Sequence, residues 1–379
     1  MKKTVAVFFG GRSPEHDISI MTALGSVIKS LELTKKYDVV PVYITKTGKW
    51  LSDAKLTDIK TYQGHKIDEL IAKSKPLAVS FDGGFTIGKK RIDIAFPAMH
   101  GAYGEDGSLM GLLRMAGIPF VGSDMDASVI AMDKVLTKQV AQANNIPTSK
   151  FVFFTRSEIV TGVHLLTDAV EKALRYPLFV KPAHLGSSIG ISKVKNNVEL
   201  VNALEVAAYY DEKIIVEEAV PNLIEVTVPI IGNDTLTPAL VERPLSKEDG
   251  VFDFETKYIN GGGGKKGGAK QSGAQGYSEL PATLPGDLYA KSLEVATKLF
   301  HAIGATGIAR VDLLIDEKKG EVYFNEVNPL PGSLYAHNWR ASGISGVELV
   351  EKLIGYANER FEAKNKLTST FDSSFLQQF

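Results

Sequence analysis

Short apolar runs alternate with amphipathic stretches in the first third of the chain. Residues 4–9 are apolar, β-branched and aromatic, and the Gly-Gly turn that follows them is typical of a buried parallel strand that has just ended. A helix predicted over 17–31 and strands predicted over 38–45 and 92–97 continue the alternation. This pattern predicts a doubly wound α/β unit, which binds its ligands at the carboxyl ends of the strands.

The pattern changes after a long helix that we predict over 126–144. Shorter strands and helices between 151 and 218 indicate a small α+β unit. Longer strands begin at 225, and a glycine- and lysine-rich stretch over 261–276 interrupts them. We therefore predict three folded units and a polar tail, with the boundaries 1–125, 126–217, 218–363 and 364–379.

The composition excludes several classes of protein. Lysine plus arginine (43) balances aspartate plus glutamate (44), which rules out a global basic field for nucleic acid. The absence of cysteine excludes disulfides, thiolate nucleophiles and cysteine-ligated zinc. No stretch approaches the ~20 apolar residues of a membrane helix, and the first apolar run is too short for a secretory signal. We expect a cytoplasmic protein with neither nucleic acid nor membrane as a partner.

Two apolar strands near the C-terminus carry regularly spaced polar residues. Arg310 and Asp312 lie on one face of the first strand, and Glu326 and Asn328 lie on one face of the second. If these strands pair, three hard oxygen donors converge, which suits Mg²⁺ bound to nucleotide phosphates, with the arginine stabilising anionic charge. The alternative is a salt-bridged polar face. The rigid Asn-Pro-Leu-Pro-Gly turn that begins at Asn328 favours a built site.

Lysine and small residues form a second candidate site. Lys181 ends an apolar strand, and the loop 186–190 offers backbone N–H groups and hydroxyls to phosphate oxygens. This is not a Walker A motif, and a flexible hairpin with an exposed lysine is the alternative. Glu217, followed by Glu225, lies in an extended linker of the kind that can hold an adenine edge and a ribose. Most glutamates in such positions are solvated strand ends.

Two loops are expected at the carboxyl edge of the first sheet. Glu15 lies in the loop 10–17 and His100 in the loop 100–107. Glu15 also suits a helix cap, and His100 suits a hydrogen-bonded strand-end histidine. Lys257 and Tyr258 precede the glycine-rich stretch 261–276, which is typical either of a lid or of a disordered surface insertion.

In sequence order, these motifs together resemble those of the D-alanine–D-alanine ligases of the ATP-grasp superfamily. The signature Gly-Gly-x-Ser-x-Glu-His-Glu-x-Ser is matched by residues 10–19, with Asp17 in place of the second glutamate. The other matching motifs lie at 100–107, 132–134, 181–190, 257–258, 310–312 and 326–328. The resemblance runs from about residue 4 to about residue 357, and the order of the motifs makes it specific.

The resemblance implies an α/β and α+β architecture, namely an ATP-grasp fold preceded by an N-terminal doubly wound α/β domain. It implies an ADP-forming ligase that joins two D-alanines to D-alanyl-D-alanine through an acyl phosphate, for peptidoglycan precursors. It also implies ATP and two Mg²⁺ ions, with Mn²⁺ as an alternative, and a homodimer.

The resemblance also assigns roles to residues. Contacts with the ATP phosphates are implied for Lys134, Lys181 and Lys257, and contacts with adenine and ribose for Glu217, Glu218, Val220 and Glu225. The implied metal ligands are Asp312, Glu326 and Asn328. The first D-alanine is expected at Glu15, Ser187, Tyr258 and His100, and the oxyanion at Arg310 and the N–H of Gly332.

The chain departs from the family after Gly332. The serine that grips the second substrate's carboxylate aligns with Ser333 if the loop is about four residues shorter, or with His337 if there is no gap. Met110 replaces a glutamine that follows the His100 loop, whereas Tyr258 favours a D-amino acid over a hydroxy acid as acceptor. Two alternatives therefore stay open: a ligase with another acceptor, such as D-serine or D-lactate, and a non-catalytic ATP-binding homologue.

Overall fold

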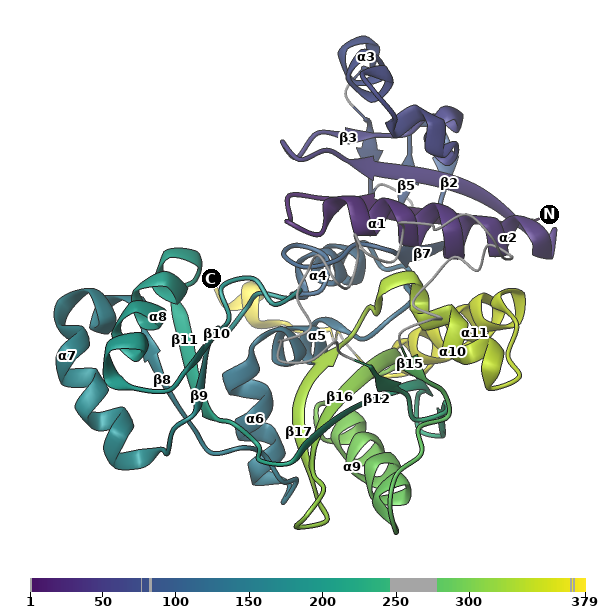
Figure 1. The fold of residues 1–379 in the computed structure, drawn as a ribbon. Helices are drawn as coiled ribbons and strands as arrows, with labels where there is room; N and C mark the ends of the chain where they lie inside the picture. The colour runs from purple at the N-terminus through teal and green to yellow at the C-terminus, as the bar shows by residue number, and fades with distance from the viewer. Residues whose placement is uncertain (1, 76, 82–83, 246–277, 369, 371) are drawn as a thin grey trace.

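The computed structural model describes residues 2–75, 77–81, 84–245, 278–368, 370 and 372–379. Within these residues, three four-stranded sheets form three lobes, and the helices α5 (Met125–Met132) and α6 (Lys134–Ala143) lie between them (Figure 1). None of the helices described here is both long enough and apolar enough to cross a membrane. The domain boundaries given above stay predictions.

The first lobe is a largely parallel sheet with helices on both faces. Its strands in spatial order are β3 (Trp50–Leu51), β2 (Tyr37–Ile44), β1 (Lys3–Gly10) and β7 (Ile94–Pro97). Its main helices are α1 (His16–Thr22), which continues through a π-helical segment (Ala23–Ile28) into α2 (Lys29–Thr34), and α4 (Ser108–Met115). Val5 and Val7 pack with α1 and α2, whereas Ala6 and Phe8 pack with α4, because successive residues of a strand point to opposite faces. The predicted doubly wound unit is confirmed.

Shorter elements complete the first lobe. They are two 3₁₀ turns (Ala54–Thr57 and Ile59–Tyr62), α3 (Lys66–Lys73), β4 (Val79–Ser80), β5 (Thr86–Ile87) and β6 (Lys90–Arg91).

The prediction of a single helix over 126–144 is wrong, because the helix is interrupted at one residue. Asp133 is extended, with φ −88° and ψ 104°, and separates α5 from α6. Its carboxylate accepts hydrogen bonds from two N–H groups in the first turn of α6, at 2.9 and 3.1 Å. An aspartate that caps a helix in this way stabilises a start rather than an interior position. The break makes Lys134 the first residue of α6.

The second lobe is an antiparallel sheet covered on one face by α7 (Arg156–Ala173) and α8 (Asn197–Tyr210). Its strands in spatial order are β10 (Ser192–Val194), β9 (Leu178–Pro182), β11 (Lys213–Glu218) and β8 (Phe151–Thr155). Val180 and Val216 pack against the helices. Because side chains alternate along each strand, Lys181 and Glu217 lie on the opposite face.

The third lobe is the sheet that carries the predicted oxygen donors. Its strands in spatial order are β13 (Leu236–Pro238), β12 (Leu223–Gly232), β16 (Gly307–Asp316) and β17 (Glu321–Asn328). Its other elements are β14 (Arg243–Pro244), β15 (Ser278–Glu279), α9 (Leu288–Ala302), a 3₁₀ turn (Gly332–Tyr335), α10 (Ala336–Ala341) and α11 (Gly346–Asn365). A last 3₁₀ turn (Phe375–Gln378) lies near the C-terminus, away from this lobe (Figure 1). β16 and β17 pair in antiparallel register, with Asp312 opposite Glu326 and Arg310 opposite Asn328.

A partly buried arginine on α11 ties the first lobe to the third. The Arg360 guanidinium donates to the carbonyls of Phe120 and Gly122, which end the first lobe, and to Thr306 Oγ1 before β16. Its carbon also lies 4.5 Å from the centre of the Phe120 ring. This clamp holds the carboxyl edge of the first sheet close to β16 and β17.

Candidate active site

The two loops predicted at the edge of the first sheet lie against each other. Gly101 has a φ of +68°, and a Cβ at this position would lie only 2.4 Å from Ser13 Oγ and 3.0 Å from Glu15 Oε2. Only glycine allows this approach without displacing its neighbours. Glu105 accepts a hydrogen bond from the N–H of Gly101 at 2.7 Å. The two loops therefore present Glu15 and Glu105 side by side.

Glu15 also contacts the small-residue loop of the second lobe. Ser187 Oγ donates to Glu15 Oε1 at 2.5 Å. Burial, and then the negative charge of Glu105, raise the pKa of Glu15 above its ordinary value. A buried carboxylate next to another carboxylate is stabilised by a cation, so this corner suits the ammonium group of a ligand.

His100 is buried and belongs to a chain of hydrogen bonds between the first and third lobes. Its Nε2 lies 2.8 Å from Thr22 Oγ1, and the same oxygen accepts the N–H of Ser333 at 2.8 Å. Its Nδ1 lies 4.0 Å from Glu105. This geometry is that of a hydrogen-bonded histidine at a strand end, and a contact of His100 with the first D-alanine stays a prediction; the sequence does not predict Thr22 as the connecting residue.

Lys134, the first residue of α6, lies against the small-residue loop. Its Nζ donates to the carbonyl of Leu185 at 2.7 Å and lies 3.8 Å from Glu326 Oε2. Lys134 therefore stands between the loop 186–190 and the oxygen donors of β17.

A buried group of two lysines and one glutamate links the three central elements α6, β9 and β11. Glu217 accepts a hydrogen bond from Lys181 at 2.8 Å, and its other oxygen lies 3.2 Å from Lys138 Nζ. Burial would raise the pKa of Glu217, but the two lysines outweigh it and lower that pKa. Burial lowers the pKa of Lys138, whereas in Lys181 the charge of Glu217 overcomes burial and raises the pKa.

Lys138 is a residue that the sequence analysis missed. Its side chain is fully buried, and it also donates to Ser149 Oγ at 3.2 Å and to the carbonyl of Phe324 at 3.4 Å. The signal that could have found it is its spacing. Lys138 follows Lys134 by four residues, so the two share one face of α6.

The cluster predicted on the C-terminal strands is present. Arg310 donates to both oxygens of Asp312, at 2.8 and 2.6 Å, and Asn328 Nδ2 donates to Asp312 at 3.2 Å. Thr227 Oγ1 on β12 donates to the same carboxylate at 2.5 Å. Burial would lower the pKa of Arg310, but Asp312 raises it well above its ordinary value. The guanidinium therefore stays charged next to the oxygen donors.

The remaining predicted nucleotide contacts lie where β11 leads into β12. Glu218 accepts the N–H of Arg175 at 2.9 Å, so its side chain is engaged and only its backbone is available for an adenine edge. Val220 is partly buried in the connection, and Glu225 on β12 contributes to the raised pKa of Lys181. The predicted contacts Lys257 and Tyr258, and the stretch 261–276, lie outside the described residues.

One hollow brings together residues from all three lobes. It is lined by Glu15, Glu105, Ala131, Met132, Lys134, Leu185, Gly186, Glu326, Val327, Asn328 and Pro329. At one end a carboxylate pair suits an ammonium group, and at the other a lysine and oxygen donors suit phosphate and a divalent cation. Asp312, Glu326 and Asn328 carry oxygen donors of the kind that Mg²⁺ prefers, so their chemistry fits this metal, although both Asp312 oxygens are paired with Arg310 here.

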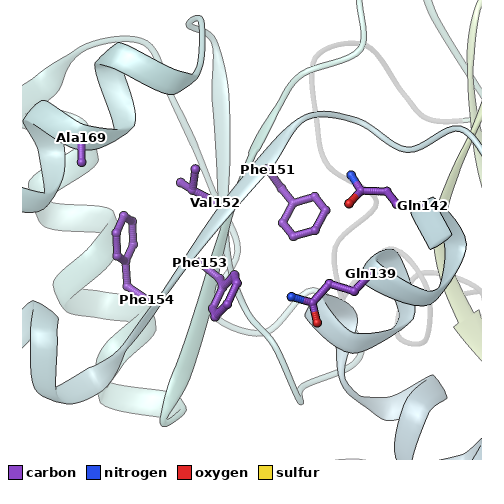
Figure 2. Close-up of a pocket in the computed structure, with 7 residues that line it drawn as sticks. All are labelled: Gln139, Gln142, Phe151, Val152, Phe153, Phe154 and Ala169. Atoms are coloured by element: carbon purple, nitrogen blue, oxygen red, sulfur yellow. The ribbon is translucent and has the colours of Figure 1, made fainter.

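A second hollow lies between α6 and β8 and has a different character. Phe151 and Phe153 of β8 face Gln139 and Gln142 of α6, and the rest of the lining is apolar (Figure 2). None of its lining residues is charged, and none is among the predicted site residues. The chemistry of the site therefore belongs to the first hollow.

The two residues proposed to grip a second carboxylate differ in their surroundings. Ser333 is exposed, and its N–H bonds to Thr22. His337 Nε2 lies 2.9 and 3.0 Å from the oxygens of the buried Glu242, a residue that the sequence analysis did not single out. Met110 is fully buried in the core under α4, so its replacement of a glutamine does not alter the hollow directly.

Comparisons with known proteins identify the family. Family models described as the N-terminus and the C-terminus of D-ala D-ala ligase match residues 4–123 and 140–355. A D-alanine–D-alanine ligase of Acetivibrio thermocellus is 36% identical over 95% of this chain and 97% of its own length. One from Geobacillus thermodenitrificans is 36% identical over 98% of this chain and 100% of its own length.

Two solved structures extend the comparison to the fold. A D-alanine-D-alanine ligase from Coxiella burnetii superimposes with a TM-score of 0.76 at 26% identity and covers 96% of this chain and 98% of its own. VanG D-Ala:D-Ser ligase from Enterococcus faecalis has a TM-score of 0.76 at 31% identity, over 94% of this chain and 100% of its own. The fold is therefore of the ATP-grasp class, as predicted. Within that class, the chain belongs to the family of D-alanine–D-alanine ligases.

Proposed function

We propose that the protein joins two D-alanines to D-alanyl-D-alanine in the cytoplasm, converts ATP to ADP and phosphate in the process, and so supplies peptidoglycan synthesis. The observation that carries this proposal is the single hollow in which Glu15, Lys134, Glu326 and Asn328 meet. The similarity to relatives named D-alanine–D-alanine ligase supports the same activity. We also propose a homodimer, as the family resemblance implies.

In the first step, the carboxylate of one D-alanine attacks the γ-phosphate of ATP. Glu15 binds the ammonium group with Ser187 beside it, and Lys134 and Lys181 neutralise the charge on the phosphates. Two Mg²⁺ ions held by Asp312, Glu326 and Asn328 would supply further charge neutralisation. Glu217, the backbone of Glu218 and Val220, and Glu225 hold the adenosine. The resulting acyl phosphate has a good leaving group.

In the second step, the amine of another D-alanine attacks the acyl carbon. Negative charge develops on the carbonyl oxygen, and Arg310 stabilises it together with the N–H of Gly332. The C–N bond forms, the bond between the acyl carbon and the phosphate oxygen breaks, and the proton lost by the amine passes to the departing phosphate or to water, which leaves the peptide bond. The second carboxylate is expected near Ser333, next to the loop that departs from the family.

A ligase with a different acceptor is the second candidate. The observation in its favour is the altered turn after Gly332, together with the similarity to the structure of VanG D-Ala:D-Ser ligase. D-serine, D-lactate and other amino acids are the acceptors to compare.

Phosphate release with ATP, Mg²⁺ and D-alanine, combined with mass spectrometry of the product, tests the proposal. We expect D-alanyl-D-alanine. Release only after another acceptor is added would favour the second candidate. ATP binding without phosphate release from any acceptor would favour a non-catalytic homologue.

A further inference from the structure

The turn that follows Pro331 has an unusual backbone. Ser333, Leu334 and Tyr335 have φ values of 52°, 53° and 54°, so three consecutive residues with side chains are left-handed. This conformation is unfavourable for each of them, and three in succession persist only when their surroundings over-determine them. The turn lies on the side of Arg310 where the second substrate is expected, so what holds it bears on that substrate.

Contacts from several elements hold the turn. The N–H of Ser333 donates to Thr22, and Leu334 is buried in the core of the first lobe. The ring of Tyr335 lies between the Arg310 guanidinium, 5.3 Å from the ring centre, and the His337 ring, whose centre is 4.5 Å away. The aromatic ring is therefore the contact between the turn and Arg310.

One buried carboxylate lies behind this arrangement. Glu242 is 2% exposed and accepts hydrogen bonds from His337 at 2.9 Å and from Asn338 Nδ2 at 3.1 Å. Burial, and then the negative charge of Glu242, raise the pKa of Tyr335, so this phenol stays protonated. Glu242 also exchanges two backbone hydrogen bonds with Thr227, which donates to Asp312.

We propose that Glu242 is a positioning residue for the second substrate. It holds His337, whose ring packs against Tyr335, and through this contact it supports the left-handed turn and the face of Arg310 that meets the acceptor. Glu242 touches neither substrate nor nucleotide, and His337 acts through Tyr335 rather than as the carboxylate ligand. This inference rests on the proposed ligase function and identifies the group that sets affinity for the acceptor, a small D-amino acid.

Glu242→Gln tests the inference because it keeps the volume of the side chain and removes its charge. We expect the KM of the second D-alanine to rise about tenfold to a hundredfold, as for a lost charge-assisted hydrogen bond. The KM for ATP should stay within about twofold, the usual scatter between variants. Positional isotope exchange within ATP, which reports acyl-phosphate formation alone, should also be unchanged. If Glu242 had a merely structural role, the substitution would weaken acceptor binding, weaken ATP binding and slow the isotope exchange together.

Asp316→Asn is the matched control. Asp316 is also a buried carboxylate and accepts a hydrogen bond from Asn222 Nδ2 at 3.2 Å. It is the last residue of β16, at the opposite end of that strand from Arg310. We expect it to lower stability without a selective change in the KM of the acceptor. Tyr335→Phe, which keeps the ring, decides the question if Glu242→Gln does not fold. It should raise the KM of the acceptor by a smaller factor.

The outcomes separate this inference from the proposed function. If wild-type protein forms dipeptide and both variants leave the KM of the acceptor unchanged, the inference is wrong and the ligase function stands. If wild-type protein forms no product from any acceptor, both are wrong. A selective rise in both variants, absent in Asp316→Asn, supports the inference.

Discussion

The two sides of the hollow are built in different ways. On the donor side, Glu15, Lys134 and Lys181 come from the first lobe, from α6 and from the second lobe, and hydrogen bonds hold them to Ser187, Leu185 and Glu217. On the acceptor side, a strained turn depends on Glu242, which lies 95 residues from His337 in the sequence and belongs to no motif. The comparison teaches that sequence motifs identify the residues that are expected to touch ligand. They do not identify a residue, such as Glu242, that positions a divergent loop.

The largest expected effect is at Arg310, where the two sides meet. Arg310→Ala should lower kcat about 100- to 1000-fold, because the oxyanion loses its charged donor. Nucleotide affinity, measured by titration with a fluorescent ATP analogue, should be nearly unchanged. Arg310→Lys, which cannot donate to both oxygens of Asp312, should give an intermediate rate. Turnover close to wild type in Arg310→Ala would refute its assignment to the oxyanion.

Glu15→Gln breaks the donor side alone. We expect the KM of the first D-alanine to rise about tenfold to a hundredfold, since the amide cannot pair with the ammonium group. In the wild type, the pKa of Glu15 lies above its ordinary value of 4.5. As the pH falls, the carboxylate is therefore protonated, and activity is lost, at a higher pH than for an ordinary glutamate. A pH profile of kcat/KM should show this acid limb, and Glu15→Gln should lack it. The same limb in both proteins would assign it to another group.

Ser333→Ala probes the acceptor side without touching Glu242. The KM of the second substrate should rise about fivefold to tenfold, the range for one neutral hydrogen bond. The first half-reaction, followed by positional isotope exchange in ATP, should not change. A variant with unaltered kinetics would show that Ser333 does not hold the second carboxylate and that the shortened-loop alignment is wrong.

The smallest expected effect concerns His184, which lies just before the loop 186–190. His184 lies 3.4 Å from Asp133 and 2.9 Å from Asp211, and hydrogen bonds to these carboxylates raise its pKa to about 9. A raised pKa contributes stability that is complete below pH 6.5 and is lost as the pH rises through 9. Because the imidazole is partly exposed, we expect only about 1 kcal/mol.

Urea unfolding of wild-type protein and His184→Gln at pH 6 and pH 9.5 measures this contribution. The difference in the free energy of unfolding between the two proteins should shrink at the higher pH. His65→Gln, which removes an exposed histidine beside Asp68, is the control and should show no such trend. A constant difference for His184→Gln would mean that its charge does not hold the loop.

Local pattern was sufficient for much of the fold. The apolar run 4–9 identified a strand buried on both faces, and the alternation in 310–312 and 326–328 correctly placed the oxygen donors together. Periodicity did not reveal the break at Asp133, since an aspartate can occupy a helix interior or cap a new helix. Tertiary contacts decide between an interior and a capping position for Asp133. The new helix that starts after it brings Lys134 to the loop 186–190.

The sequence by itself determined the family, the layered α/β and α+β architecture and the residues with chemistry, because these depend on short-range periodicity and on motif order. Only the tertiary structure decided that Lys138 is buried against Glu217, that His337 pairs with Glu242, and that Ser333 meets Thr22 through its backbone. These contacts join residues far apart in sequence, and each involves at least one buried residue. A low dielectric makes such polar pairs strong, and no local pattern records which partners share it.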